Sequence, residues 1–469
     1  MKKSFLLLLI LLSSLVLAGC VGKSKINAID SDCEYLKKVL EEAAIDVSKS
    51  IEEGLDSAQL IEDIKSEYAR LLKKQWLKSE LNENGIASNQ FAQAISNVFA
   101  QELTRPNCHI SVYGDSYGYA PFVAYAPFFS DVYFEKSGDE YLVYSSENPS
   151  VKPGMKYSGE SKDLYKTFMD GKELYRFGIL ANKYPYNSKI NIEGKKYRVR
   201  VSIYTGPVEQ PENLSHWLDD KVLKIIFSSC NWQKEAEYNR MMEALASISK
   251  IIREEEVDLV LIDMRRNGGG KVGIAQELAA ALNGIVDGSQ QESDFFNYAS
   301  YLSYGAVYIN TLTTRTVNAL VGRGSENLNQ ELLGRSDTRY VLLNQENEDK
   351  FIREFTPGYN GKIILLTDWG TASAAEDLIA ILKMQFKDKV LIVGQNTLGC
   401  LDYGNVHDYL LRNSRLKVSL CQTDNTNIVM LNSETGWHGD GLGFYPDYWY
   451  RLDDDLDIEE LISKLFILP

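Results

Sequence analysis

The chain has 469 residues, of which 44% are hydrophobic, so it has enough apolar side chains for the cores of two or three domains. Sixty-five acidic residues against 50 basic ones give a net charge of −15 at pH 7, which argues against nucleic acid as a partner. The same balance argues against a basic patch that would hold the protein on a membrane surface.

The N-terminus has the pattern of a bacterial export signal. Residues 1–3 are basic at two positions, 5–17 are apolar, and the Leu-Ala-Gly-Cys sequence at 17–20 looks like a lipobox. The apolar run is shorter than the roughly 20 residues that a membrane-spanning helix needs. We therefore expect residues 1–20 to be a lipoprotein signal peptide. The mature chain would be attached through lipid on Cys20 to a cell membrane and face its extracytoplasmic side.

Five further cysteines are scattered through the chain and have neither the density of a disulfide framework nor the spacing of zinc ligands. They are Cys33, Cys108, Cys230, Cys400 and Cys421. One disulfide is compatible with this number, and Cys400 with Cys421 is the first pair to test. We expect no metal site.

Residues 21–106 are predicted to form an N-terminal helical domain. Apolar residues recur at helical spacing in three stripes, over 36–43, 61–71 and 91–99, in a stretch almost free of Gly and Pro. Residues 82–85 are the expected turn before the third helix. The stripes are interpreted as the packing surfaces of a small bundle.

Residues 107–205 are predicted to form a small β-rich module, because they are rich in aromatic residues and turns. Its tyrosines form either a binding face or half-buried packing. His109 lies at the junction between the last predicted helix and the first strand. Its position alone leaves a structural and a functional role open.

Residues 206–469 have the pattern of an α/β domain with a parallel sheet. Short apolar strands are expected at 222–227, 260–263, 362–367 and 390–393. A long amphipathic helix is predicted over about 235–252. Residues 283–355 are polar and are interpreted as an insertion, or as a cover over the crevice expected at the carboxyl ends of these strands.

Two strand–loop–helix units in this domain carry the residues that point to chemistry. Three consecutive glycines, 268–270, follow one strand, and Ser373 lies at the predicted N-terminus of the helix that follows another. In a parallel sheet, both loops lie at the carboxyl ends of their strands and face one crevice. A serine nucleophile opposite a donor-rich loop fits this arrangement. A helix cap for Ser373 and a phosphate-binding loop at 268–270 are the competing interpretations.

Four stretches occur in the same order as the signatures of the C-terminal-processing, or tail-specific, peptidases. Residues 263–270 resemble the DLRxNxGG motif of that family, and 373–376 resemble its nucleophile turn. Residues 394–399 resemble its GExTxG loop, and 440–447 its EGxGxxPD element. The resemblance implies a ClpP/crotonase-like α/β core, and the module at 107–205 stands where relatives have a PDZ domain, here in degenerate form.

The resemblance is closer to the tricorn-like Ser/His branch of that family than to its Ser/Lys branch. The lysine of the Ser/Lys dyad would follow the GExTxG loop, where this chain has Cys400. His109 matches the D-x-H-like element that supplies the base in the tricorn-like branch, although Asn107 replaces the Asp. A hydroxyl residue and a distant glutamate complete the tetrad there, and this chain offers Cys108 and Asp440 instead.

The resemblance thus implies Ser373 as the nucleophile and His109 as the general base, with Asp440 in support. The N–H groups of Ala374 and Gly269 would hold the oxyanion. The expected protein is a lipid-anchored, extracytoplasmic serine endopeptidase that acts on polypeptides without a cofactor. The alternative is a catalytically inactive relative that serves as a peptide- or glycan-binding surface lipoprotein.

Overall fold

The structure is a computed structural model, and it describes most of the chain after residue 27. The described residues are 28–75, 80–103, 107–186, 188–203, 213–286, 295, 299, 306–309, 312–313, 339–342, 358–426, 428, 435–451 and 458–465. The predicted signal peptide at 1–20, its Cys20 and most of the predicted insertion at 283–355 lie outside them. Within the described residues, no helix is both long enough and apolar enough to span a membrane.

The chain divides into two compact units, each assembled from segments that are distant in sequence. The first comprises Met1–Phe122, Gly305–Leu343 and Tyr403–Asp424. The second comprises Val123–Tyr304, Asn344–Asp402 and Asn425–Pro469. The predicted division into contiguous domains stays a prediction, because each compact unit is built from three separate segments of the chain.

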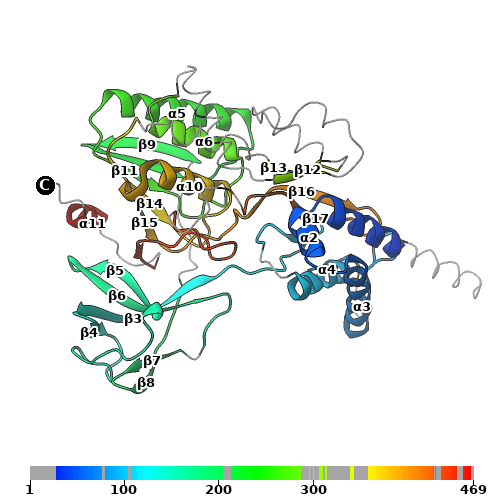
Figure 1. Cartoon of the computed structure of the whole chain (residues 1–469), viewed down its shortest axis with the longest axis horizontal. Coiled ribbons are helices and arrows are strands. Elements are labelled where there is room, and N and C mark those ends of the chain that lie inside the picture. The colour runs from blue at the N-terminus through cyan, green and yellow to red at the C-terminus, as the bar shows by residue number, and fades with distance from the viewer. Residues whose placement is uncertain are drawn as a thin grey trace, which may run out of the picture. The chain divides into compact units, whose positions relative to one another are not determined.

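The first unit combines helices with an antiparallel sheet. Its helices are residues 28–42, α2 (Ile45–Glu52), α3 (Ser57–Gln75) and α4 (Ser88–Glu102) (Figure 1). Its strands are β1 (Ser111–Tyr113), β2 (Gly118–Tyr119), β12 (Ala306–Ile309), β13 (Arg339–Leu342), β16 (Tyr403–Leu411) and β17 (Leu416–Asp424). The sheet order is β13-β12-β17-β1-β2, and β16 pairs with β17.

The predicted apolar stripes of the helices are buried in this unit. Leu36, Ile64 and Phe91 come from three different helices and share one core with Val418 of β17. Burying one such side chain contributes about 1.5–3 kcal/mol to stability. Because strands from beyond residue 400 complete this core, an independent helical bundle stays a prediction.

The second unit contains the predicted α/β core. Its six-stranded sheet has the order β18-β15-β14-β11-β10-β9, and every neighbouring pair is parallel except β10 with β9. The strands are β9 (Leu214–Asp219), β10 (Val222–Phe227), β11 (Leu259–Asp263), β14 (Lys362–Thr367), β15 (Val390–Gly394) and β18 (Tyr448–Trp449). The mixed α/β architecture and the four predicted parallel strands are confirmed.

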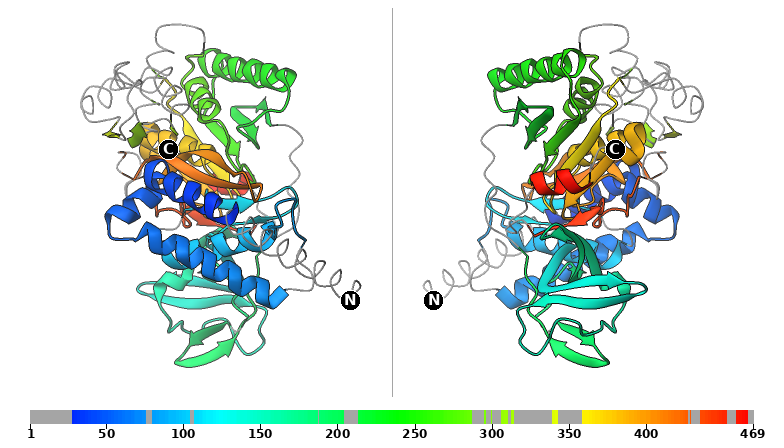
Figure 2. Two further views of the ribbon diagram at one scale, coloured as in Figure 1. Left: turned by 90° about the vertical axis from the view of Figure 1, so that its right-hand side faces the viewer. Right: turned by 90° about the vertical axis from the view of Figure 1, so that its left-hand side faces the viewer.

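Successive side chains of these strands point to opposite faces of the sheet and are covered by different elements. Val260 and Ile262 pack in the large core with three helices, α5 (Glu235–Glu254), α6 (Val272–Leu282) and α10 (Ala374–Phe386) (Figure 1 and Figure 2). Leu259 and Leu261 pack on the other face with Leu461 of α11 (Ile458–Leu465). Burial on both faces explains why the sequence shows continuous apolar runs here.

The predicted β-rich module belongs to the second unit from Val123 onward, whereas its first residues, with β1 and β2, belong to the first unit. Its sheet has the order β4-β3-β6-β5, formed by β3 (Ala126–Ser137), β4 (Glu140–Ser146), β5 (Leu164–Met169) and β6 (Lys172–Ala181). A separate hairpin consists of β7 (Lys189–Ile192) and β8 (Lys195–Arg198). The Tyr450 hydroxyl donates to the Phe168 carbonyl at 2.8 Å, and Tyr165 lies 4.8 Å from Trp449 between ring centroids. At least part of the tyrosine content is therefore packing, and the PDZ resemblance stays a prediction.

The five cysteines of the described residues are all free thiols, so Cys400 and Cys421 do not form the disulfide considered above. The two belong to different units, and each is buried in its own surroundings. Scattered cysteines in a sequence do not reveal which pairs come close enough to be bridged. Among the same residues, no group of three or more His, Cys, Asp or Glu side chains is arranged to hold a metal ion.

Candidate active site

Ser373 lies on a sharp turn between strand β14 and helix α10, as predicted. It is the N-cap residue of α10 and has φ 54° and ψ −122°, a conformation that non-glycine residues rarely adopt. Ser373 is half-buried, whereas Ala372 and Ala374 on either side are buried. Such backbone strain costs about 1–3 kcal/mol and persists only where the surroundings enforce it.

The buried carboxylate of Glu376 holds the start of helix α10 in place. One carboxylate oxygen accepts the N–H groups of Ser373 and Cys400, each at 2.8 Å. The other accepts the Thr397 hydroxyl at 2.5 Å and the Gly399 N–H at 2.7 Å. Burial raises the pKa of Glu376 to about 7, against the lowering effect of these donors. Glu376 therefore joins the nucleophile turn to the 394–399 loop, and the Ser-x-x-Glu spacing of a capping box is the signal for it.

The triple-glycine loop packs directly against Ser373. A Cβ atom on Gly269 would lie 2.6 Å from the Ala372 carbonyl oxygen and 2.8 Å from both the Ala374 nitrogen and the Ser373 Cβ. Gly269 also has φ 84°, so only glycine fits this position without strain. Its N–H donates to Asn267 Oδ1 at 3.0 Å. The structure thus brings Gly269, Ser373 and Ala374 together.

The Ala374 N–H is at the first turn of α10, where helices leave backbone donors without partners. No hydrogen bond from this N–H is formed within the part of the chain that the structure describes. Because the helix dipole adds a partial positive charge at the same end, the position favours a developing negative charge next to Ser373.

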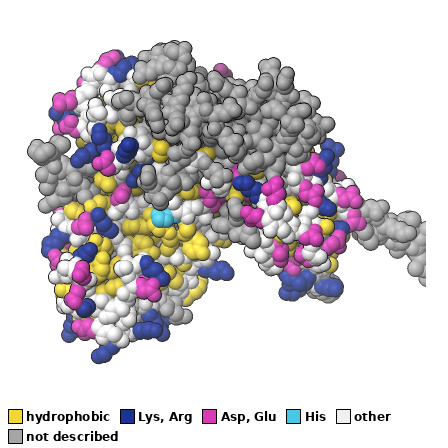
Figure 3. Space-filling view, in the orientation of Figure 1, with side chains coloured by type: hydrophobic (Ala, Val, Ile, Leu, Met, Phe, Trp, Pro, Cys, Tyr) yellow, Lys and Arg dark blue, Asp and Glu magenta, His cyan; other side chains and the backbone are white. Residues whose placement is uncertain are grey.

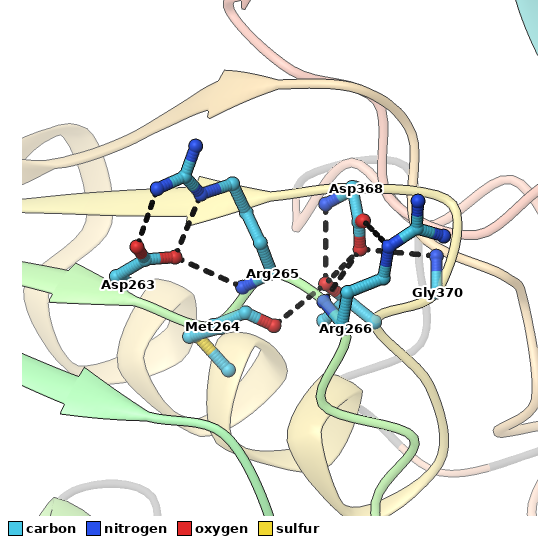
Figure 4. A network of polar contacts seen from close by, with 7 residues as sticks. Asp263, Met264, Arg265, Arg266, Asp368 and Gly370 are labelled. Carbon is cyan, nitrogen blue, oxygen red and sulfur yellow. Dashed lines mark hydrogen bonds and ion pairs between the residues drawn. The ribbon is translucent and has the colours of Figure 1, made fainter. Parts of the chain in front are cut away.

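Asp368 and Arg266 form a second connection between the two loops, which the sequence reasoning missed (Figure 4). Asp368 is fully buried, and its Oδ1 accepts the N–H groups of Arg266 at 2.8 Å and Gly370 at 3.0 Å. The Arg266 Nε lies 3.1 Å from Asp368 Oδ2, and the Thr371 hydroxyl donates to the Met264 carbonyl at 2.9 Å. Burial raises the pKa of Asp368, and its hydrogen bonds oppose that shift.

Arg265, the neighbouring arginine, pairs with a carboxylate at the end of its own strand. Its guanidinium lies 2.9 Å and 2.6 Å from the two carboxylate oxygens of Asp263, at the end of its own strand (Figure 4). The two arginines of the motif therefore differ in their direct partners, since Arg266 pairs with Asp368 and Arg265 pairs with Asp263. A lone Asp after a strand was the available sequence signal for Asp368.

His109 belongs to the first unit and lies beside a buried polar cluster. The Asn107 side chain accepts the His109 N–H at 2.9 Å and donates to Asp46 Oδ2 at 2.7 Å. Burial lowers the pKa of His109 to about 4, opposed by a hydrogen bond to the backbone of Tyr403. Burial also raises the pKa of Asp46 to about 6. At neutral pH the imidazole is therefore uncharged, the form that accepts a proton.

Asp440 lies in the second unit, on a loop that packs against the segment after Cys400. Its Oδ1 accepts the N–H groups of Leu401 at 2.9 Å and Asp402 at 3.0 Å, and the Gly441 N–H donates to the Gly399 carbonyl at 2.8 Å. Within its own unit, Asp440 therefore shapes the loop that Glu376 also holds.

A strained serine turn packed against a glycine loop is the arrangement of an acyl-transfer site, and the chain's similarities agree with it. Residues 227–423 match the model of Peptidase family S41. The matched segment contains β11, β14 and both loops of the site. The match supports placing this part of the chain in family S41 and supports a serine peptidase. No curated protein matches the chain.

Several solved structures resemble the chain at low identity. Mature CPAF has 15% identity and a TM-score of 0.37, with 91% of this chain and 93% of that chain covered. The photosystem II D1 C-terminal processing protease has 12% identity and a TM-score of 0.31, with 92% and 94% covered. A lipoprotein from Streptococcus agalactiae has 14% identity and a TM-score of 0.27, with 51% and 66% covered. At such TM-scores, these likenesses carry no argument about this chain.

Proposed function

We propose that the chain is a serine endopeptidase of the tricorn-like Ser/His type, with Ser373 as its nucleophile. The observation that carries the proposal is the packing of Gly269 against a strained Ser373 at the N-terminus of α10. In the first step the Ser373 oxygen attacks a peptide carbonyl, and an acyl-enzyme forms as the amine leaves. Water then hydrolyses the acyl-enzyme by the same route in reverse order.

The oxyanion of the tetrahedral intermediate is held by backbone donors beside Ser373. The Ala374 N–H is the principal one, because it has no partner within the described residues and lies at the helix N-terminus. The Gly269 N–H is the second, shared with Asn267 Oδ1. Loss of one such donor typically lowers the rate about a hundredfold or more.

His109 is the proposed general base, because it matches the D-x-H-like element that supplies the base in the tricorn-like branch. It takes the Ser373 proton and returns it to the leaving amine. Burial lowers its pKa to about 4, so the ring is neutral at pH 7 and can accept a proton. Asp440 is the proposed carboxylate that supports His109, because of its position in the EGxGxxPD-like element.

The proposed location is the extracytoplasmic face of a cell membrane, with lipid on Cys20 as the anchor. The lipobox-like sequence at 17–20 and the short apolar run before it support this location. The proposed substrates are polypeptides, and no cofactor takes part in the mechanism.

Turnover of an unstructured polypeptide tests the proposal. We expect Ser373→Ala and His109→Ala to reduce the rate to background, because they remove the nucleophile and its base. His216→Ala is the matched control. His216 lies in β9, its ring is 2.8 Å from the Ser247 hydroxyl of α5, and it has no part in the proposed mechanism. Full activity in either of the first two variants would overturn the assignment.

A second candidate is an inactive relative that binds peptides or glycans at the cell surface. Cys400 favours it, because this residue replaces the lysine base of the Ser/Lys branch and is buried, with its N–H on Glu376. This candidate predicts no Ser373-dependent chemistry at all, which separates it from the peptidase.

A further inference from the structure

A surface pocket of about 360 Å³ opens in the second unit beside the triple-glycine loop. The segment after β10 and the first turns of helix α5 supply its walls, including Asn231, Trp232, Glu237 and Arg240. None of these residues has a part in the mechanism proposed above.

The pocket and Ser373 adjoin the same loop. A Cβ atom on Gly270 would lie 2.4 Å from the side chain of Asn231, and one on Gly269 would lie 2.8 Å from the Ser373 Cβ. Cys230, next to Asn231, forms two backbone hydrogen bonds with the loop. Its N–H donates to the Gly269 carbonyl, and its carbonyl accepts the Lys271 N–H, both at 3.1 Å. An extended peptide advances about 3.3 Å per residue, so the pocket lies within about three residues of a peptide bond at Ser373.

The pocket lining holds one guanidinium, Arg240, and one carboxylate, Glu237, three residues apart on helix α5. Arg240 is exposed, and its guanidinium forms no hydrogen bond or ion pair within the described residues. The Glu237 carboxylate accepts the Gln233 N–H at 2.8 Å; this contact, and the nearby charges of Lys234 and Arg240, lower its pKa, so its carboxylate is engaged without a direct ion pair to Arg240. Lys271 adds a second positive charge, with its Nζ 3.6 Å from the centre of the Trp232 ring.

The net charge of −15 does not decide the local charge. On the face that Figure 3 shows, Lys and Arg side chains are interspersed with Asp and Glu. Because screening confines surface electrostatics to about 10 Å, the pocket's preference depends on its nearby charges, the cations Arg240 and Lys271 against the single carboxylate of Glu237.

We propose that this pocket is a substrate subsite that binds a carboxylate group through Arg240. The planar guanidinium can donate two parallel hydrogen bonds to a carboxylate. The carboxylate comes from an Asp or Glu side chain near the cleaved bond, or from the α-carboxylate at the end of the substrate. This inference rests on the proposed peptidase function and adds a specificity to it.

Cleavage-site profiling tests the subsite, because a mixed peptide pool reveals sequence preferences for any substrate. The full-length protein and its Arg240→Ala and Arg240→Glu variants would digest the same pool of unstructured peptides, in native and C-terminally amidated form, with products sequenced by mass spectrometry. We expect the unmodified protein to favour bonds with Asp or Glu at one fixed position within three residues, or bonds near a free C-terminus. The amidated pool separates these two sources.

The Arg240 variants should change selectivity rather than turnover as a whole. We expect Arg240→Ala to slow cleavage at carboxylate-bearing sites about fivefold, the effect of one partly exposed ion pair, and to leave neutral sites unchanged. Arg240→Glu should shift the preference toward Lys and Arg. Lys250→Glu is the matched control, because it makes the same charge change on α5 at a residue paired with Glu254. Identical cleavage profiles in all four proteins would overturn the subsite.

A binding measurement separates failure of the subsite from failure of the peptidase proposal. In Ser373→Ala, fluorescence of Trp232 would report binding of polyalanine peptides that carry one Glu or one Gln, with free or amidated C-termini, and Trp232→Phe gives the background. We expect a carboxylate-dependent signal that is lost in the Arg240→Glu background. Such a signal, together with no turnover by the unmodified protein, would support the subsite and reject the peptidase. Turnover by the unmodified protein without charge preference, and without this signal in Ser373→Ala, would support the peptidase and reject the subsite.

Discussion

Ser373 and His109, the two residues on which the proposed mechanism depends, are held in different ways. At Ser373, two buried carboxylates accept backbone N–H groups, since Glu376 binds the turn itself and Asp368 binds the residues before it. At His109, one side-chain amide, Asn107, connects the histidine backbone to the buried Asp46. Hydrogen bonds to charged acceptors are the stronger kind, and they act here on a strained backbone.

This difference separates the proposed site into a rigid part and a part that responds to its environment. The strained φ of Ser373 needs surroundings that over-determine it, and the carboxylates supply them. At the histidine, burial shifts the pKa values of both His109 and Asp46 toward the neutral forms, and its N–H is held by an uncharged amide rather than a carboxylate. Each prediction below acts on one of the two parts.

The largest effect is expected from Gly269→Ala, which disturbs the rigid part. The new Cβ would lie 2.6 Å from the Ala372 carbonyl oxygen, at a φ of 84° that alanine does not tolerate. We expect kcat to fall about a hundredfold or more, as when an oxyanion donor is displaced. Gly268→Ala is the control, since a Cβ there meets nothing within 4 Å. Steady-state kinetics of both variants decide the point, and equal losses would contradict it.

Asn107→Ala tests the other part through stability. The variant removes the donor to the buried Asp46 carboxylate and the acceptor of the His109 N–H, so we expect a loss of about 2 kcal/mol in the free energy of unfolding. Asn148→Ala removes a similar pair of hydrogen bonds, to Arg198 and Ser150, at a more exposed position. Its loss should stay within about 0.5 kcal/mol. Urea denaturation measures both, and matching values would remove the distinction.

Arg266→Ala and Arg265→Ala compare two neighbours in the same motif. Arg266 holds the buried Asp368 of the serine loop, whereas Arg265 pairs with Asp263 on its own strand. We expect Arg266→Ala to lower kcat about tenfold, equivalent to about 1.4 kcal/mol, through a shift of the turn. Arg265→Ala should raise the activation free energy by less than half of that amount. A larger loss in Arg265→Ala would show that Asp368 does not position Ser373.

The smallest effect concerns pH and belongs to the histidine part. A general base must be neutral, and burial lowers the pKa of His109 to about 4 from an ordinary value of 6.5. The part of the acidic limb of kcat/KM that belongs to His109 should therefore lie below pH 6.5, and a loss between pH 7 and pH 6 belongs to Glu376, whose pKa is raised to about 7. His216→Ala should leave the limb in place. A half-maximal rate above pH 6.5 that persists in Glu376→Gln would mean that His109 is solvated, or is not the base.

The sequence predicted the α/β core and the meeting of its two loops because their signals are local. Apolar runs followed by glycine or serine turns mark parallel strands and their carboxyl ends, which is enough to bring Ser373 near Gly269. The same reasoning missed the Arg266–Asp368 connection. That contact joins residues 102 positions apart, and nothing in either neighbourhood identifies its partner.

Long-range packing also explains what the sequence could not give in the first unit. Asn107 and Asp46 are 61 positions apart, and β17, which completes the helical core, comes from beyond residue 400. Tertiary contacts of this kind depend on the whole fold, whereas periodicity reports only which face of an element is buried. The candidate disulfide between Cys400 and Cys421 was wrong for the same reason.

Labelling with a fluorophosphonate probe tests the central claim most directly, because only an activated serine reacts with it. The protein, Ser373→Ala, His109→Ala and His216→Ala would be treated with the probe at pH 7, and the modified residue located by mass spectrometry. The account predicts labelling on Ser373 alone, absent from Ser373→Ala, strongly reduced in His109→Ala and retained in His216→Ala. An unlabelled protein, or labelling that is unchanged in Ser373→Ala, would contradict it.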